Sequence, residues 1–263
     1  MSDAPKVRVA VCGLRGRLGR AVAELAATTP GVRIVGGIGR TAGYGPGDVP
    51  IVPLDRSIEL LAETDVLLDV SAPDATAALL EPGRLLDCRA LVIGTTGLDA
   101  MTEPRIDQLS GSAAVLVAAN FSLGVNLLEA LVARAAAALP PERYDIEIVE
   151  THHAGKVDAP SGTALALGRA AATARGAALE DVRCDGRSGP SGPRPRGQIG
   201  IHALRGGAVP GEHRVHFLGP RERIELAHQA LDRTLFAEGA LAAVLWIAGR
   251  PHGRYRMADV IGL

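Results

Sequence analysis

The sequence predicts an α/β fold, in which a Rossmann-like doubly wound parallel sheet is joined to a second α+β domain. Short apolar runs alternate with helical patterns through the first half of the chain, as in parallel sheets with helices on both faces. Gly13, Gly16 and Gly19 form a G-x-x-G-x-x-G turn directly after the first apolar run. The strands of the second half instead alternate apolar and polar residues, which is typical of half-exposed sheets.

The first predicted strand, Val7–Gly13, is a short apolar run that ends in glycine, as buried parallel strands do. A helical pattern follows from Leu18 and stops at Pro30, because proline cannot continue a helix. The remaining predicted elements of this half are strands at 32–39, 65–71, 89–97 and 113–122, with helices at 57–64 and 74–87.

The second half begins with a long helical pattern, and its composition then changes. In chain order we predict a helix at 124–139, a strand at 144–153, a helix at 162–175, a Gly/Pro/Arg-rich loop at 183–198, strands at 199–207, 212–219 and 222–230, and an apolar helix at 234–249. The last helix is expected to return to the first domain. The predicted domains are therefore 1–123 with 234–263, and 124–233.

Composition argues against several classes of function. The formal net charge is −1 and aromatic residues make up 3%, which disfavours nucleic acid and anionic membranes as partners. Cys12, Cys88 and Cys184 are scattered without metal-ligand spacing, so we expect neither a disulfide framework nor a metal site. We find no signal peptide and no apolar run of the ~18 residues that a membrane span needs. A cytoplasmic protein is expected.

The glycine turn lies where dinucleotide-binding domains hold a pyrophosphate, between the first strand and the first helix. The spacing departs from G-x-G-x-x-G, and a tight strand-to-helix link is the alternative. The second strand ends at Gly39–Arg40, where NAD sites usually carry a carboxylate. Arg40 could pair with a 2′-phosphate or be an exposed turn residue. We predict that NADPH is used at least as well as NADH.

The stretch THHAGKVDAPSGTAL at 151–165 gathers His152, His153 and Lys156 just before a helical pattern. Such a cluster suits anion binding and proton exchange near neutral pH. Ser161 stands where a helix N-cap belongs. The N–H groups of Gly162 and Thr163 would follow it and offer a carboxylate site, although plain capping is the alternative.

Adjacent histidines could instead bind a metal, but neighbours on a strand point to opposite faces. No second cluster has ligand spacing, so no metal is predicted. The other histidines, which include His202, His213, His216, His228 and His252, are interpreted as sheet-face or surface residues without a role. Asp158 is expected to orient the loop.

The string ETHHAGKVDAPSGTAL resembles the signature of the dihydrodipicolinate reductases, roughly E-x-H-H-x-x-K-x-D-A-P-S-G-T. The resemblance continues in order through VAVCGLRGRLGR, VIGTTGL, AANFSLGVN, YDIEIVE, GQIGIHALRGG, GEHRVHF and ERIELAHQA. It implies reduction of 4-hydroxy-2,3,4,5-tetrahydrodipicolinate to tetrahydrodipicolinate by hydride from NADPH or NADH, in lysine and diaminopimelate biosynthesis. It also implies a homotetramer assembled through the sheets of the second, substrate-binding domain.

The resemblance also implies the role of each site residue. His152 would be the acid/base group and Lys156 the proton donor or charge stabiliser, while His153, Ser161, Gly162 and Thr163 bind the substrate carboxylates. Gly13, Leu14, Arg15, Gly16, Arg17 and Leu18 would hold the pyrophosphate, and Arg40 the 2′-phosphate. Gly94, Thr95 and Thr96 would line the nicotinamide site, with Thr96 also near substrate, and Ala118, Ala119, Asn120 and Phe121 would close over the nicotinamide.

The chain departs from the family pattern at Gly39, where many members carry Glu, and at Val70, where Phe is expected. The first departure favours NADPH, and the second could loosen packing near the cofactor. The segment 40–57 is short, which could open the adenine side. A related amino-acid dehydrogenase is the alternative function, but the full HH-x-x-K…SGT string argues against it. Retention of His152 and Lys156 argues against a non-catalytic NADP sensor or scaffold.

Overall fold

A computed structural model of the chain describes residues 6–85 and 88–263. The chain divides into two compact units, one built from the chain up to Ser122 together with Thr234–Leu263, the other from Leu123–Arg233. The last two residues of the helix predicted at 74–87 lie outside the described residues.

The first unit contains an eight-stranded sheet in the order β13-β7-β6-β5-β1-β2-β4-β3. All neighbouring pairs are parallel except β3 with β4. The strands are β1 (Val7–Cys12), β2 (Val32–Gly39), β3 (Gly43–Tyr44), β4 (Pro50–Pro53), β5 (Val66–Asp69), β6 (Ala90–Ile93), β7 (Ala114–Val117) and β13 (Gly253–Tyr255). Because β5, β6 and most of β1 are buried, their near-continuous apolar sequences match a sheet covered on both faces.

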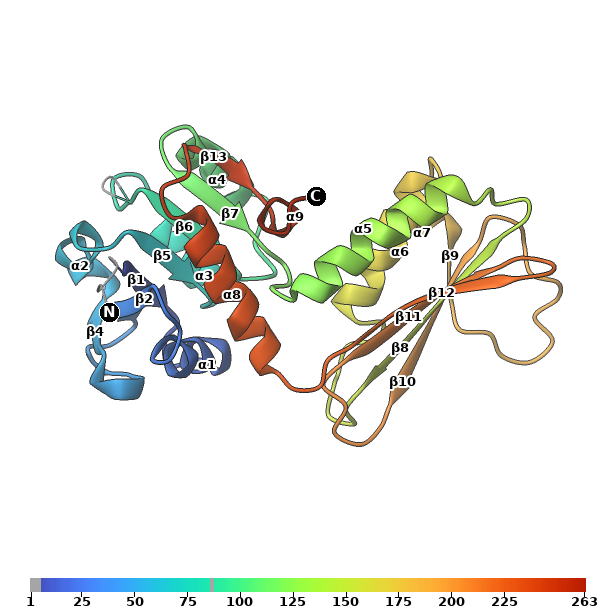
Figure 1. Cartoon of the computed structure of the whole chain (residues 1–263), viewed down its shortest axis with the longest axis horizontal. Helices are drawn as coiled ribbons and strands as arrows, with labels where there is room; N and C mark the ends of the chain where they lie inside the picture. The colour runs from blue at the N-terminus through green and yellow to red at the C-terminus, as the bar shows by residue number, and fades with distance from the viewer. Residues whose placement is uncertain (1–5, 86–87) are drawn as a thin grey trace. The chain divides into compact units, whose positions relative to one another are not determined.

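Helices cover both faces of this sheet, as the predicted doubly wound fold requires (Figure 1). One core joins α1 (Arg17–Ala26) and α8 (Thr234–Ile247) to one face. A second core joins α2 (Ile58–Ala62), α3 (Pro73–Leu79) and α4 (Thr102–Ser110) to the other face. The unit also contains α9 (Met257–Val260) and the 3₁₀ turns η1 (Pro46–Asp48) and η2 (Leu54–Arg56).

Several elements of the first unit differ from the sequence expectation. The strands β3, β4 and β13 and the helices α4 and α9 were not expected, since they are short or mostly polar. The helix predicted at 74–87 ends already at Leu79. Pro82 and Gly83 follow it, and Gly83 has φ of +86°, which helical backbone does not adopt.

The second unit contains a five-stranded mixed sheet in the order β12-β11-β8-β10-β9. Its strands are β8 (Asp145–His152), β9 (Arg183–Asp185), β10 (Ile199–Arg205), β11 (Glu212–Leu218) and β12 (Arg223–Gln229). β8 pairs antiparallel with β11 and parallel with β10. Residues 183–198 were expected to be loop throughout, but the first three form β9 because they pair with β10.

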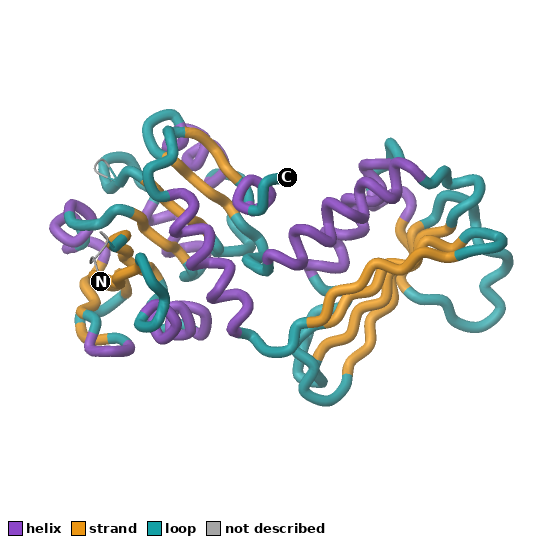
Figure 2. Tube along the Cα trace, in the orientation of Figure 1, coloured by secondary structure: helices purple, strands orange, loops and turns teal. Residues whose placement is uncertain are grey.

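The helices of the second unit lie along one side of its sheet (Figure 2). Side chains from α5 (Leu123–Ala138), α6 (Gly162–Ala174) and α7 (Leu179–Val182) share one core with β8, β10 and β11. In β8, Ile146, Ile148, Glu150 and His152 are the buried residues of a strictly alternating strand. The inner face of the sheet therefore changes from aliphatic to polar at the carboxyl end of β8.

Candidate active site

The glycine turn of the first unit is shaped by backbone contacts that leave no room for side chains. Gly13 has φ of +87°, and a methyl group there would lie 2.7 Å from the Val70 carbonyl oxygen. Gly16 is the N-cap of α1, without a side-chain cap and with no acidic residue in the first turn. The first N–H groups and the positive dipole end of α1 are thus suited to an anion.

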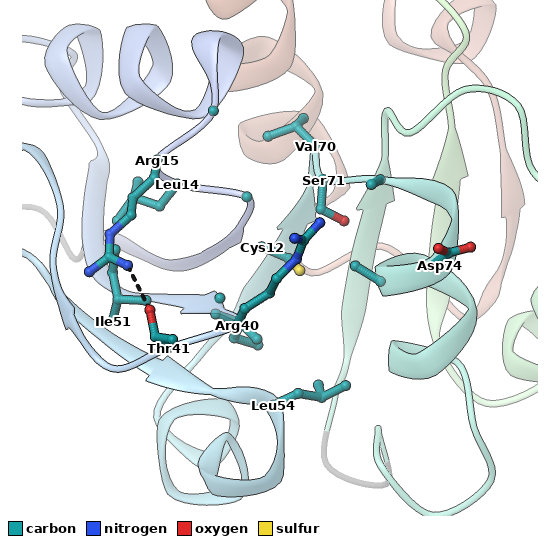
Figure 3. Close-up of a pocket in the computed structure, with 16 residues that line it drawn as sticks. Cys12, Leu14, Arg15, Arg40, Thr41, Ile51, Leu54, Val70, Ser71 and Asp74 are labelled. Atoms are coloured by element: carbon teal, nitrogen blue, oxygen red, sulfur yellow. Dashed lines mark hydrogen bonds between the residues drawn. The ribbon is translucent and has the colours of Figure 1, made fainter.

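A pocket of about 930 Å³ adjoins this turn (Figure 3). Its lining includes Gly13–Gly16 from the turn and Gly39–Thr41 from the end of β2, with Ser71 and Asp74 opposite. The Arg40 side chain extends into the pocket, and Arg15 donates a hydrogen bond of 3.2 Å to Thr41 Oγ1. Two arginines beside a glycine cradle and an open helix N-terminus fit a phosphate-rich dinucleotide.

Not every predicted cofactor residue lines this pocket. Leu14 does so but is 1% exposed, Leu18 packs against the core, and Arg17 is exposed as the first residue of α1. Gly94, Thr95 and Thr96 follow β6, and Ala118, Ala119, Asn120 and Phe121 follow β7. Both groups therefore lie beyond the carboxyl ends of parallel strands, where open α/β sheets bind ligands.

The ends of β5, β6 and β7 are packed together around Gly94. A methyl group on Gly94 would overlap the Phe121 ring and lie 3.3 Å from Val70 Cγ1. Phe121 is 3% exposed, so its ring supports the Gly94 backbone from within the core. Thr95 Oγ1 accepts a 3.2 Å hydrogen bond from the Ser71 N–H, which links the turn after β6 to the pocket lining.

In the second unit, His152 lies at the carboxyl end of β8 beside a buried carboxylate. His152 Nδ1 is 2.6 Å from Glu150 Oε2, and Glu150 is 0% exposed. Burial lowers the pKa of His152, and the neighbouring Glu150 only partly offsets this. Burial would raise the pKa of Glu150, but hydrogen bonds from Arg205, His152 and the Ser161 N–H keep it below its usual value.

His213 of β11 adds a second buried imidazole to this cluster. Its ring meets that of His152 edge to face, with ring centres 5.3 Å apart. His213 Nε2 is 3.0 Å from Ser161 Oγ. Burial, with a smaller contribution from His152, lowers the pKa of His213 to about 4. His213 is therefore neutral near pH 7.

Lys156 and His153 belong to the loop that connects β8 to α6. Lys156 Nζ is 2.8 Å from Asp158 Oδ1, and the backbone N–H of Lys156 donates to the His153 carbonyl oxygen. The His153 N–H in turn donates to the Val209 carbonyl oxygen. Asp158, which is expected to orient this loop, contacts Lys156 within it.

The start of α6 matches the sequence expectation of a capped helix. Ser161 Oγ accepts a hydrogen bond of 3.1 Å from the Ala164 N–H, which confirms Ser161 as the N-cap. Gly162 is exposed and open space surrounds it, whereas the polar atoms of Ser161 already have protein partners. The Gly162 end of α6 is therefore exposed, whereas Ser161 is buried.

Sequence reasoning missed three members of this cluster. Glu150 lies within the family signature and Arg205 within a predicted strand, but neither was expected to belong to the site. His213 was interpreted as a sheet-face or surface residue without a role; it lies on the buried face of its sheet and is 4% exposed. The alternation of β8 was the available signal for Glu150, because it places a carboxylate on the buried face.

Among residues 6–85 and 88–263, no group of three or more His, Cys, Asp or Glu residues has the arrangement of a metal site. Within the same residues, no helix combines the length and hydropathy that a membrane span requires.

Comparisons with known proteins point to one family. The models of dihydrodipicolinate reductase, N-terminus and C-terminus, match residues 7–121 and 124–261. A 4-hydroxy-tetrahydrodipicolinate reductase of Methylocella silvestris is 45% identical over 270 residues, which cover 98% of this chain and 97% of the relative.

Two solved structures share the fold. The dipicolinate-bound dihydrodipicolinate reductase of Paenisporosarcina sp. TG-14 has a TM-score of 0.76 at 23% identity, covering 97% of this chain and 99% of the other. The DAP dehydrogenase of C. glutamicum, solved with DAP, has a TM-score of 0.53 at 15% identity, covering 98% and 94%. The architecture alone is therefore common to reductases and amino-acid dehydrogenases.

Proposed function

The chain belongs to the dihydrodipicolinate reductase family, and we propose that it reduces 4-hydroxy-2,3,4,5-tetrahydrodipicolinate to tetrahydrodipicolinate. The reaction consumes NADPH or NADH and a proton and releases water, as a step of lysine and diaminopimelate biosynthesis. The observation that carries the proposal is the cluster at the end of β8, where His152, Lys156 and the open N-terminus of α6 belong to one short segment of chain.

The N-terminus of α6 suits one of the substrate's two carboxylates. Its first N–H groups, at Gly162 and Thr163, follow directly after the Ser161 cap, and a helix N-terminus favours negative charge. We assign His153 to the same carboxylate binding. Ser161 is proposed to hold the helix start rather than to touch substrate, because its hydroxyl and N–H are bonded within the protein.

His152 and Lys156 are proposed to handle charge and protons. When bound, the reduced nicotinamide supplies a hydride to the conjugated C=C–C=N system that remains after water is lost. Negative charge then builds on the substrate, and the Lys156 ammonium neutralises it. His152 exchanges a proton through Nε2, since Nδ1 is engaged by Glu150.

The preference for NADPH over NADH is part of the proposal. Arg15 and Arg40 both line the pocket at the end of β2, and Asp74 is the carboxylate in the same lining. Gly39 stands directly before Arg40, so that the strand end carries no carboxylate to repel a 2′-phosphate or hold a free ribose hydroxyl. A guanidinium matches the phosphate oxygens in a bidentate geometry.

A cytoplasmic homotetramer completes the proposal. The helices of the second unit cover one face of its sheet, and β12 keeps most of its residues exposed. An exposed sheet face of this kind suits assembly through the second units. Light scattering on the purified protein measures the mass directly.

The activity is tested by coupling the protein to the synthase that condenses pyruvate with aspartate semialdehyde, while NADPH oxidation is followed by absorbance. Oxidation that depends on the synthase supports the reductase. NADPH oxidation with an amino acid's keto acid and ammonia, but not with the synthase product, would favour an amino-acid dehydrogenase instead.

A further inference from the structure

Glu150 is surrounded by hydrogen-bond donors on both oxygens. Oε1 accepts from the Ser161 N–H at 2.9 Å and from Arg205 Nη2 at 2.8 Å. Oε2 accepts from Arg205 Nη1 at 2.8 Å and lies 2.6 Å from His152 Nδ1. An ionised carboxylate offers about four acceptor positions, and the N–H donors of Ser161 and Arg205 occupy three of them. The buried residue is therefore ionised and acts as an acceptor only.

This arrangement determines the tautomer of His152. Because an ionised carboxylate cannot donate, Nδ1 of His152 must carry the proton in the bond to Glu150. Nε2 is then the nitrogen that loses or gains a proton. A methyl group on Gly211 would lie 3.0 Å from His152 Nε2, so glycine keeps the space beside this nitrogen open.

Arg205 connects the same carboxylate to the loop between β8 and α6, which we call the lysine loop because it carries Lys156. Its guanidinium pairs with both Glu150 oxygens and also donates to the Asp158 carbonyl oxygen at 2.7 Å. Parallel pairing of β10 with β8 sets Arg205 directly beside His152 in the register. The ion pair between Glu150 and Arg205 thereby holds three parts of the site together. These are the end of β8, the lysine loop, and Ser161 at the start of α6.

The geometry points to Glu150 and Arg205 as a positioning pair. The pair orients His152 and Lys156 and takes no part in the reaction itself. Glu150 holds His152 as the Nδ1–H tautomer with Nε2 toward the substrate side. Arg205 keeps Glu150 ionised and fixes the loop through Asp158. The kinetic consequence rests on the proposed reductase function, whereas the tautomer can be measured without any activity.

Glu150→Gln is the deciding variant, because glutamine is isosteric but carries one N–H₂ group. If that group replaces Oε2, it faces the His152 Nδ1–H and Arg205, and the imidazole must change its tautomer. If it replaces Oε1, it faces the Ser161 N–H and Arg205. Either orientation sets donors against donors.

We expect turnover of Glu150→Gln to fall roughly 10- to 100-fold, by analogy with carboxylates that orient metal-bound histidines. The affinity for NADPH should stay unchanged, because the variant lies in the second unit. The groups that face His152 are Glu150, Arg205, Lys156 and His213. Glu150 raises the pKa of His152 against burial and its cationic neighbours, so the limb of the pH–rate profile that reports His152 should move to lower pH.

Arg205→Lys separates the two functions of the pair, which are to fix the tautomer of His152 and to hold the lysine loop. Lysine keeps a positive charge beside Glu150 but lacks the two-pronged geometry that also reaches Asp158. His152 should keep its Nδ1–H tautomer, while turnover falls because the lysine loop is held less firmly. A loss equal to that of Glu150→Gln together with a changed tautomer would contradict this division.

The matched control is Glu147→Gln. It removes another carboxylate of β8, which is also paired with arginines and a histidine but lies on the other face of the strand.

The tautomer is read from the ¹⁵N spectrum of histidine-labelled protein, with His152→Gln to identify the signal, and chemical denaturation reports stability for each variant. The inference is overturned if His152 of the wild type is in the Nε2–H form, or if Glu150→Gln keeps wild-type turnover. It is equally overturned if turnover of Glu147→Gln falls as far at equal folded fraction. Absent reductase activity in the wild type would remove the proposed function and leave the spectrum to decide the tautomer.

Discussion

Lys156 Nζ lies 2.8 Å from Asp158 Oδ1, so the ammonium that we propose to neutralise charge already has a carboxylate partner two positions along the same loop. Asp158 is exposed, and the hydrogen bond from Lys156 lowers the pKa of its carboxyl group. The Asp158 carboxylate is therefore charged at neutral pH. In the proposed mechanism the substrate competes with Asp158 for the Lys156 ammonium, so we expect Asp158 to influence substrate affinity.

Replacing Asp158 with Asn should change the KM for the substrate while leaving the free energy of unfolding almost unchanged. Exposed ion pairs typically contribute ~0.2–1 kcal/mol, so the free energy of unfolding should change by less than ~1 kcal/mol. Turnover should stay well above that of Lys156→Ala, since the ammonium is retained. Steady-state kinetics of both variants check this, and equal loss in the two would show that Asp158 takes part in the chemistry.

Arg40→Ala should weaken the use of NADPH and leave that of NADH nearly unchanged. Hydrogen bonds to charged groups contribute ~1.5–3 kcal/mol, which corresponds to a loss of roughly 10- to 100-fold in kcat/KM for NADPH. The control is Arg33→Ala, because Arg33 is an exposed arginine near the start of the same strand. An equal loss with both cofactors would place Arg40 away from the 2′-phosphate.

Ser161→Ala should destabilise the second unit. The change removes the cap on the Ala164 N–H and leaves His213 Nε2 without its hydroxyl partner. Loss of an N-cap costs ~0.5–2 kcal/mol, and the buried imidazole adds to this cost. Urea denaturation measures the effect, with the exposed loop residue Ser191 replaced by Ala as control. An unchanged midpoint would mean that α6 does not depend on this cap.

The buried imidazole of His213 should make the protein less stable as the solution is acidified. The pKa of His213 is lowered to about 4 in the fold, against an ordinary value of 6.5. Above pH 6.5 both states are neutral, and below it the unfolded chain binds the proton first. The free energy of unfolding should therefore fall between pH 6.5 and about 4, by up to about 3 kcal/mol.

Urea titrations at several pH values in this window measure how steeply the free energy of unfolding falls with falling pH. Hydrogen bonds from Arg187, Arg194 and His202 outweigh burial and lower the pKa of Glu147 to about 2, so this carboxylate loses its contribution only at lower pH. His213→Gln should flatten the slope, while His252→Gln, at an exposed position, should not. A wild-type slope in His213→Gln would assign the pH dependence to other groups.

Much of the fold could be predicted from the sequence because the buried parallel strands are continuous apolar runs. β9 and β13 could not, since each has only three residues and is defined by its partners. The helix α4 was missed because its sequence, TEPRIDQLS, is mostly polar and contains a proline. Such elements depend on tertiary contacts rather than on local pattern.

The candidate site likewise has one part that the sequence predicts and another that depends on tertiary contacts. The segment from His152 to Thr163 is contiguous, so its helix cap and its titratable cluster were visible as a motif. Arg205 is 55 residues from Glu150, and His213 is 52 from Ser161. These pairs meet only through the register of β8 with β10 and β11, which periodicity does not reveal.

The most direct test of the central claim follows deuterium from NADPH, labelled at the transferable hydrogen, into the product of the synthase-coupled reaction. The proposed reaction gives tetrahydrodipicolinate that carries one deuterium, which mass spectrometry detects. His152→Ala and Lys156→Ala should form it ~10²–10⁴-fold more slowly while still binding NADPH, and the exposed control His252→Ala should match the wild type. Unlabelled product, or near-wild-type rates in both active-site variants, would contradict it.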